Sequence, residues 1–146
     1  MRYQEQVEIS SPVSRVFDYM DDVAREPEWQ PSLVEASKEP SGPTAVGTRK
    51  RYVSEFMGRR IENTYLTTLF ERNRRVVYET SPGSVLQAKV ELSFEEVGAG
   101  TRVTMAVDGK AAGPLRFLPQ GLLEGVFRKE LQASLDLLRK NLEGAA

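Results

Sequence analysis

The chain has 146 residues, 40% of them hydrophobic and 28% charged, which is ordinary for one globular domain. Twenty basic and 21 acidic residues leave a net charge of -1, so bulk electrostatics favours neither nucleic acid nor anionic membranes as partners. Because cysteine and histidine are both missing, disulfides, thiolate metal sites, cysteine nucleophiles and histidine bases are excluded.

The remaining composition narrows the class of protein further. No apolar run is long enough to span a membrane, and the opening MRYQEQVEIS lacks the apolar core of a signal peptide. We therefore expect a single domain over residues 1–146, located in the cytoplasm. We expect no integral membrane segment, no metal, no cofactor and no nucleic-acid partner.

The N-terminal segment predicts a strand followed by a short helix. Residues 3–9 alternate between apolar and polar types, as in a half-buried strand, with Glu5 as the exception on the apolar side. Ser11 is expected to cap the helix, and Pro12 suits its first position. A single apolar stripe runs along this helix: Val13, Val16, Phe17 and Met20.

Two prolines limit the length of this helical region. Pro27 and Pro31 bracket Trp29 and prevent regular continuation of a helix. The first helix should therefore last about three turns and be followed by a broken or one-turn segment. We interpret Trp29 mainly as a packing residue.

The middle of the chain predicts consecutive strands from residue 33 to about residue 110. Turn signals separate them: PSGP (40–43), MGRR (57–60), RNR (72–74), SPGS (81–84) and GAG (98–100). A helix should then run from about Pro119 to Glu143, because leucines and Phe127 recur at steps of three and four. Such a helix spans roughly 37 Å, enough to cross a small sheet.

Opposed residues in an antiparallel hairpin share a face, so candidate turns can be tested by the pairs they create. A turn at Gly98-Ala99 puts Glu95 opposite Arg102 on one face and Leu92 opposite Met105 on the other. A slip of one residue would destroy both patterns. We therefore predict this register, with Phe94 opposite Val103 and Val90 opposite Val107.

Two further turns extend the predicted inner face. A turn at Gly58-Arg59 pairs Phe56 with Ile61, Ser54 with Asn63, and Tyr52 with Tyr65, and it leaves Arg49, Arg51 and Glu55 outside. A turn at Asn73-Arg74 pairs Leu69 with Tyr78 and Thr67 with Thr80, with Phe70 and Val77 opposed on the outer face. For the inner faces of the two strands that flank it to coincide, the SPGS segment must then contain an odd-length loop or a bulge.

The inner face predicted in this way is mixed in character. Aliphatic residues fill one end, whereas three tyrosines and the polar Ser54, Asn63 and Thr67 occupy the other. Hydroxyl and amide groups need partners in a dry core, but a ligand cavity combines apolar walls with a few polar groups. The alternative is that the tyrosines reach solvent at the margin of the sheet.

The order of these elements resembles the START-like, or SRPBCC, superfamily, which includes the polyketide cyclase/dehydrase and lipid-transport family. The segments that carry the resemblance are VEISSPVSRVFDYMDD (7–22), PEWQP (27–31), VGTR (46–49), FMGRRI (56–61), GTRVTM (100–105) and LRKNLEG (138–144). The resemblance implies an α+β helix-grip fold. In that fold a curved antiparallel sheet of six to seven strands wraps a long C-terminal helix, and two short helices after the first strand plug one end.

That superfamily shares a pocket and no catalytic motif, so the resemblance assigns no catalytic residue. The pairing and the helix pattern together give our candidate ligand-binding residues: Lys50, Tyr52, Ser54, Phe56, Asn63, Tyr65, Tyr78, Val90, Leu92, Met105, Leu123 and Phe127. Ser54, Asn63 and the tyrosines would orient a ligand, and Lys50 or Tyr52 would polarise a carbonyl. Each of these polar groups also has an ordinary structural interpretation.

Other charged and flexible segments also have a structural and a functional interpretation. The basic clusters at 49–51, 59–60 and 72–75 alternate with glutamates, which favours a solvated outer face over a nucleic-acid site. Glu5 is either a buried acid with a raised pKa or a strand-end residue that reaches water. Gly121 and Gly125, with DGKAAGP (108–114), mark the candidate gate of the cavity.

These patterns are compatible with three functions. The first is binding of a hydrophobic small molecule, such as a lipid, isoprenoid or polyketide-like compound, in a cavity between the sheet and the C-terminal helix. The second is a polyketide cyclase/aromatase/dehydrase-like enzyme without metal, in which Tyr52, Tyr65 or Lys50 handles protons with help from Glu5. The third is a protein-interaction module that uses Phe70 and Val77 on the outer face.

Overall fold

A computed structural model describes residues 1–56, 58–112 and 116–144 of the chain. Its elements in order are β1 (Arg2–Ile9), α1 (Val13–Asp21), α2 (Glu26–Trp29), β2 (Leu33–Glu39), β3 (Arg49–Phe56), β4 (Arg59–Glu71), β5 (Arg75–Thr80), β6 (Leu86–Val97), β7 (Gly100–Ala111) and α3 (Gln120–Gly144). The strands form one antiparallel sheet in the order β1-β7-β6-β5-β4-β3-β2. The predicted helix-grip architecture is therefore confirmed.

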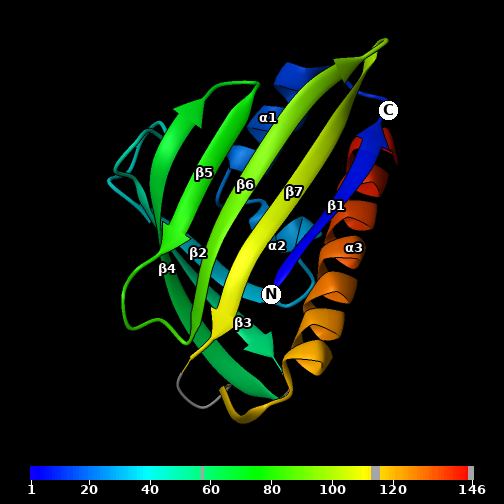
Figure 1. Ribbon diagram of the computed structural model, residues 1–146. Helices are drawn as coiled ribbons and strands as arrows, with labels where there is room; N and C mark the ends of the chain where they lie inside the picture. The colour runs from blue at the N-terminus through cyan, green and yellow to red at the C-terminus, as the bar shows by residue number, and fades with distance from the viewer. Residues whose placement is uncertain (57, 113–115, 145–146) are drawn as a thin grey trace.

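Figure 1 shows how the helices cover one face of the curved sheet. The long helix α3 runs beside β1 and contacts it, while α1 lies behind the sheet toward the end where β6 and β7 turn, and α2 lies nearer its middle. The predicted start and end of α3 agree with the structure to one residue. Because α2 contacts both α3 and β2, it closes the space between the helix and the far edge of the sheet.

The start of α1 differs from the sequence prediction. Pro12 takes the N-cap position, and no side chain caps the first turn. Ser11 is buried instead: its carbonyl oxygen accepts a hydrogen bond of 2.8 Å from the Thr101 hydroxyl, and its own hydroxyl accepts one from Arg15. The capping prediction was wrong because the Ser11 hydroxyl bonds to the Arg15 side chain instead of a backbone amide of the first turn, and the Ser11 carbonyl bonds to Thr101 of β7.

The β6–β7 hairpin has the predicted register, with Leu92 opposite Met105 and Glu95 opposite Arg102. The β3–β4 hairpin is shifted by two residues, so that Tyr52 faces Asn63 and Lys50 faces Tyr65. The turn therefore involves positions 57 and 58 rather than Gly58 and Arg59, with residue 57 outside the described part of the chain. A shift of two preserves the faces, since side chains alternate with period two.

The β4–β5 hairpin departs further from prediction. A bulge between Thr67 and Leu69, together with a three-residue connection at 72–74, puts Thr67 opposite Tyr78 and Leu69 opposite Val77. The pairs Leu69–Tyr78 and Thr67–Thr80 were therefore wrong. A bulge adds one residue to one strand and reverses the side-chain alternation beyond it.

This reversal moves Phe70 to the inner face. Its ring packs edge-on against Phe17 of α1, with centroids 5.6 Å apart. Val77 is buried, with 4% of its surface exposed. The predicted exposed pair on the outer face was therefore wrong.

The β5–β6 connection agrees with the prediction. The five-residue loop at 81–85 is odd in length, as required, and brings Tyr78 opposite Val90 on the inner face.

The apolar core is concentrated at the end covered by α1. Phe17 also packs edge-on against Phe94, with ring centroids 5.0 Å apart. Val16, Val103 and Leu138 are fully removed from solvent in the same cluster. Side chains fill the space between helices and sheet here, so the less tightly packed region lies nearer the start of α3.

Candidate functional site

The sheet and α3 enclose a cavity of about 200 Å³. All seven strands and α3 contribute side chains to its wall. Residues of the sheet's inner face that line it include Tyr3, Leu33, Tyr52, Ser54, Phe56, Ile61, Asn63, Tyr65, Tyr78, Val90, Met105 and Val107, and α3 contributes Phe127, Leu131 and Ser134. The volume is below the range of about 300–1,000 Å³ typical of drug-sized pockets, so the cavity as it stands suits a small guest.

Three tyrosines from neighbouring strands form one wall of the cavity. The ring of Tyr65 lies 5.4 Å from that of Tyr52 and 5.2 Å from that of Tyr78. Burial raises the pKa of Tyr65 to about 12 and those of Tyr52 and Tyr78 well above the usual value. All three therefore keep their protons at neutral pH and act as hydrogen-bond donors rather than as bases.

Two buried polar atoms at the cavity have no hydrogen-bond partner within the described residues. They are Nε1 of Trp29, a donor, and Oδ1 of Asn63, an acceptor. Trp29 is 2% exposed and Asn63 is 7% exposed, and both residues line the cavity. An unsatisfied buried polar group costs about 1–3 kcal/mol. Such groups are completed in solution by an ordered water or by a bound molecule.

A cluster of charged residues lines a small space that adjoins the inner end of the cavity, and Tyr52 lines both spaces. Nζ of Lys50 is 3.3 Å from Oε1 of Glu26 and 3.6 Å from Oδ1 of Asp21. The Tyr52 hydroxyl also donates to the Glu26 carboxylate, and Gln30 donates to its other oxygen at 3.2 Å. Burial raises the pKa of the Glu26 carboxyl, and the nearby Lys50 charge only partly opposes that rise.

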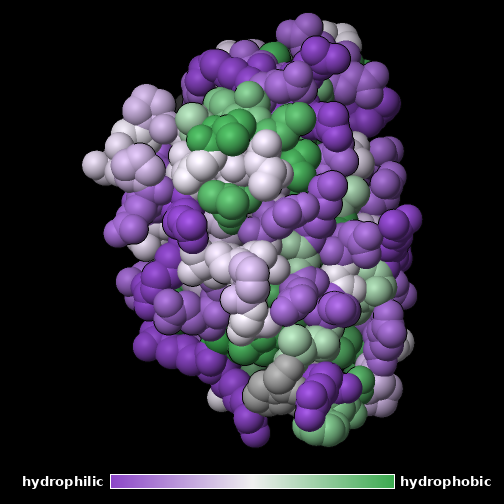
Figure 2. Space-filling view, turned by 60° about the vertical axis from the view of Figure 1, so that its left-hand side comes forward, coloured by the Kyte–Doolittle hydropathy of each residue, from purple (hydrophilic) through white to green (hydrophobic). Residues whose placement is uncertain are grey.

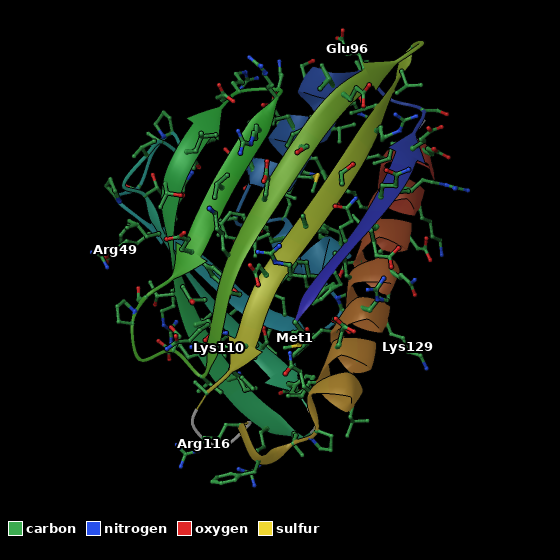
Figure 3. All side chains as sticks on the ribbon, viewed as in Figure 1. Met1, Arg49, Glu96, Lys110, Arg116 and Lys129 are labelled. Atoms are coloured by element: carbon green, nitrogen blue, oxygen red, sulfur yellow. The ribbon has the colours of Figure 1, made fainter. Side chains whose placement is uncertain are left out.

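The outer end of the cavity lies between the β3–β4 hairpin and the first turns of α3. The rings of Phe56 and Phe127 stack there, with centroids 4.9 Å apart. Lys110 lines this end and is exposed, so the cavity reaches the surface there. Figure 3 shows that Met1, Lys110 and Arg116 lie at this same end of the molecule. Gly113 and Pro114 of the candidate gate lie outside the described residues.

The predicted ligand-binding residues divide into three groups. Those that line the cavity are Tyr52, Ser54, Phe56, Asn63, Tyr65, Tyr78, Val90, Met105 and Phe127. Lys50 and Leu92 instead line a neighbouring space of about 20 Å³, which has room for roughly one water molecule. Leu123 is buried, with 2% of its surface exposed, and lines neither space.

The role of α2 in this site was not predicted from the sequence. Glu26 and Trp29 both lie on that single helical turn: both line the small adjoining space, and Trp29 also lines the cavity. Pro27 interrupts the pattern, so no periodicity signalled that residue 26 is buried. Glu5, by contrast, does not line the cavity: its carboxylate is 3.3 Å from Arg128 and 3.2 Å from Gln132 on α3.

Three arginines from the basic clusters at 49–51 and 72–75 are paired with carboxylates. Arg51 contacts Glu62 and Glu35, Arg72 lies 2.7 Å from Asp18, and Arg75 contacts Glu91. Figure 2 shows hydrophilic residues over much of this side of the molecule, with hydrophobic residues gathered in patches between them. The interleaved charges give these clusters no continuous basic surface.

Neither a metal site nor a membrane span is found among the described residues. No group of three or more acidic side chains there is placed so that it could hold a metal ion. No helix in the described part of the chain combines the length and apolarity needed to cross a bilayer.

Comparison with solved structures supports the same architecture. A START superfamily protein from Mycobacterium smegmatis is similar over 99% of both chains, with a TM-score of 0.82 and 14% identity. The Zhui aromatase/cyclase from a Streptomyces species matches with a TM-score of 0.76 and 16% identity, covering 98% of this chain and 93% of that one. A protein from Thermus thermophilus matches with a TM-score of 0.75 and 20% identity, covering 99% and 95%.

These identities are low, so the solved structures establish the fold alone. A comparison with proteins of curated function finds no significant match. A family model described as polyketide cyclase / dehydrase and lipid transport matches residues 1–143. The chain therefore belongs to the polyketide cyclase/dehydrase and lipid transport family.

Proposed function

We propose that the protein binds a small hydrophobic molecule with one polar end in the cavity between the sheet and α3. The observation that carries this proposal is the pair of unsatisfied buried atoms, Nε1 of Trp29 and Oδ1 of Asn63, in a wall that is otherwise aromatic and aliphatic. Burial of apolar ligand surface would supply affinity at roughly 25 cal/mol per Å². The two polar atoms would fix orientation.

The size of the cavity limits the class of ligand. At about 200 Å³ it accommodates a compact ring system more readily than a two-chain lipid. A longer ligand would require movement of the outer end, where the Phe56–Phe127 stack narrows the space. We therefore favour a one- or two-ring aromatic or isoprenoid compound over a phospholipid.

A cavity-filling variant tests this function. Ser54→Phe places a ring inside the cavity, whereas Ser93→Phe makes the same change on the opposite face of the sheet, next to Phe94. We expect the neutral naphthalene dye prodan to bind to the wild type and to Ser93→Phe with a blue-shifted emission, and to lose binding in Ser54→Phe. Equal binding by both variants would contradict the proposal. If Ser54→Phe alone loses binding, native mass spectrometry of the protein purified from its own host would identify the natural ligand.

A second candidate function is an enzyme of the cyclase, aromatase or dehydrase type. The observation that favours it is the hydrogen bond from Tyr52 to the buried Glu26, which connects a cavity-wall hydroxyl to an ionisable group beside Lys50. Such a pair could protonate a carbonyl oxygen of a bound poly-ketone. Tyr52→Phe should then abolish turnover while ligand affinity changes little. Turnover that survives in Tyr52→Phe would remove Tyr52 as the proton donor, and binding without any turnover in the wild type would argue for a carrier.

The protein-interaction alternative has lost its support in the sequence. Phe70 packs against Phe17 inside the fold, and Val77 is buried. Neither residue offers an exposed apolar surface to a partner.

A further inference from the structure

The small space that adjoins the inner end of the cavity is lined by more acidic than basic side chains. Two carboxylates, of Asp21 and Glu26, share the single ammonium group of Lys50 at 3.6 and 3.3 Å. The side chains of Lys50 and Glu26 are 10% and 3% exposed, so water screens this charge poorly. Among the described residues that line the two adjoining spaces, Lys50 is the cation at this end.

This charge acts on the wall of the cavity. Tyr52 lines both spaces and donates its hydroxyl hydrogen to Glu26, so the carboxylate lies directly behind a ligand-facing ring. The Glu26 charge also contributes, after burial itself, to the raised pKa values of Tyr65 and Tyr78. A second anion placed against this wall would meet the same repulsion.

The two unpartnered atoms also define which hydrogen-bonding groups a ligand must supply. Oδ1 of Asn63 needs a donor, and Nε1 of Trp29 needs an acceptor. A hydroxyl group supplies both, whereas a carboxylate supplies acceptors only. A ligand that partners both atoms must therefore offer a hydrogen to Asn63 and an acceptor to Trp29, which a carboxylate alone cannot do.

We propose that the charge of Asp21 and Glu26, only half neutralised by Lys50, makes the cavity select uncharged, hydroxyl-bearing ligands and reject carboxylates of the same skeleton. This inference rests on the proposed binding function and specifies its ligand class. Alcohols and phenols bind with the hydroxyl near Asn63 and Trp29. Free fatty acids and aromatic acids are excluded from the inner end.

The outer end of the cavity carries basic groups, so the test must distinguish a ligand whose carboxylate points outward from one whose carboxylate points inward. Lys110 and the N-terminal amino group of Met1 lie there, whereas the Glu130 carboxylate accepts a hydrogen bond from the Ser32 amide, between α2 and β2. An acid bound with its carboxylate outward would depend on Lys110 and not on Glu26. A variant at residue 26 therefore distinguishes the two orientations.

Calorimetric titration with three matched probes tests the inference. Naphthol is neutral and donates, naphthoate is anionic at neutral pH, and methyl naphthoate is larger than naphthoate but uncharged. We expect naphthol to bind at least tenfold more tightly than naphthoate, a difference of about 1.4 kcal/mol. Methyl naphthoate should also bind more tightly than naphthoate, which shows that charge and not size causes the rejection.

Substitution of Glu26 should relax this selection. In Glu26→Gln the ratio of naphthoate affinity to naphthol affinity should rise at least fivefold. Glu79→Gln removes an equal charge from the exposed outer face of β5 and should change neither affinity. Asp21→Asn provides a second variant of the cluster if Glu26→Gln folds poorly, with the same expected direction.

Two results would overturn the inference while leaving the binding function intact. The first is naphthoate binding as tightly as naphthol to the wild type. The second is discrimination that persists unchanged in both Glu26→Gln and Asp21→Asn. Failure of all three probes to bind would instead contradict the proposed function, and this inference with it.

Discussion

Nζ of Lys50 lies 3.3 Å from Oε1 of Glu26, and the two side chains are 10% and 3% exposed. The contact joins β3 to the single turn of α2, so it fixes the position of Trp29 three residues further along that turn. A buried ion pair is seldom a net source of stability, because desolvation of both charges offsets their attraction. Its retention at the inner end of a cavity therefore indicates a role for the charges themselves.

Removal of Lys50 alone should be costly. Lys50→Met leaves the carboxylates of Asp21 and Glu26 close together without a cation, and we expect a loss of about 3–5 kcal/mol in the free energy of unfolding. Lys50→Met combined with Glu26→Gln should recover at least half of that loss. Urea unfolding followed by circular dichroism measures both; a single variant within about 1 kcal/mol of the wild type would contradict the assignment of a buried pair.

Stability should depend on pH in a way that Glu26 controls. Its folded-state pKa is raised, mainly by burial, so the folded protein binds a proton more readily than the unfolded chain. The contribution of Glu26 to stability is therefore greatest below its unfolded pKa and is lost as the pH rises through its folded pKa. Each unit of difference between the two pKa values is worth about 1.4 kcal/mol.

The comparison of wild type with Glu26→Gln isolates this effect, because the other titrating groups largely cancel. As the pH falls from 7 toward the ordinary glutamate pKa, the wild type should gain stability relative to the variant. Urea unfolding at several pH values measures the difference. A gap that changes in the opposite direction would mean that Lys50 lowers the Glu26 pKa below its usual value.

Replacement of Asn63 by an apolar residue should raise the stability of the protein and weaken ligand binding. Asn63→Leu replaces a buried amide whose oxygen lacks a partner with an apolar side chain of similar size, and should stabilise the ligand-free protein by about 1 kcal/mol. The same change should weaken naphthol binding about fivefold. Thermal unfolding and calorimetry measure the two effects.

Asn141→Leu is the matched control for that experiment. The Asn141 amide donates to the Tyr19 hydroxyl at 3.0 Å and to the Glu28 carbonyl at 3.1 Å, so its removal should destabilise the protein. If both leucine variants lose stability to the same extent, then Asn63 is already satisfied in the free protein and the proposed contact is wrong.

The start of α3 should become more rigid when its glycines are replaced. An added Cβ at Gly121 or Gly125 would meet nothing within 4 Å, so close approach to the sheet does not explain these residues. Gly121→Ala and Gly125→Ala should each stabilise the helix by up to about 1 kcal/mol. If ligand entry requires movement of this end, the double variant should bind prodan more slowly at unchanged affinity, which stopped-flow fluorescence measures. An unchanged association rate would remove this end as the gate.

Local patterns in the sequence determined most of the fold. The period-two alternation of β1, the charge and apolar pairs of the β6–β7 hairpin and the leucine repeat of α3 each identified an element and its buried face, because they depend only on neighbouring residues. The inner positions Tyr52, Ser54, Asn63 and Tyr65 were also predicted. The two-residue error in register preserved their side of the sheet.

Tertiary structure decided what no local pattern encodes. The bulge at Thr67–Leu69 turned Phe70 inward, because Phe17 of α1 offers it a partner from a distant part of the chain. No sequence pattern indicated that Glu26 is buried, because Pro27 interrupts its helical turn. Burial of its carboxylate is compensated only when β3 brings Lys50 within 3.3 Å. The charge at the inner end of the cavity arises from contacts between segments far apart in sequence, and such contacts exist only after the sheet has closed around the helices.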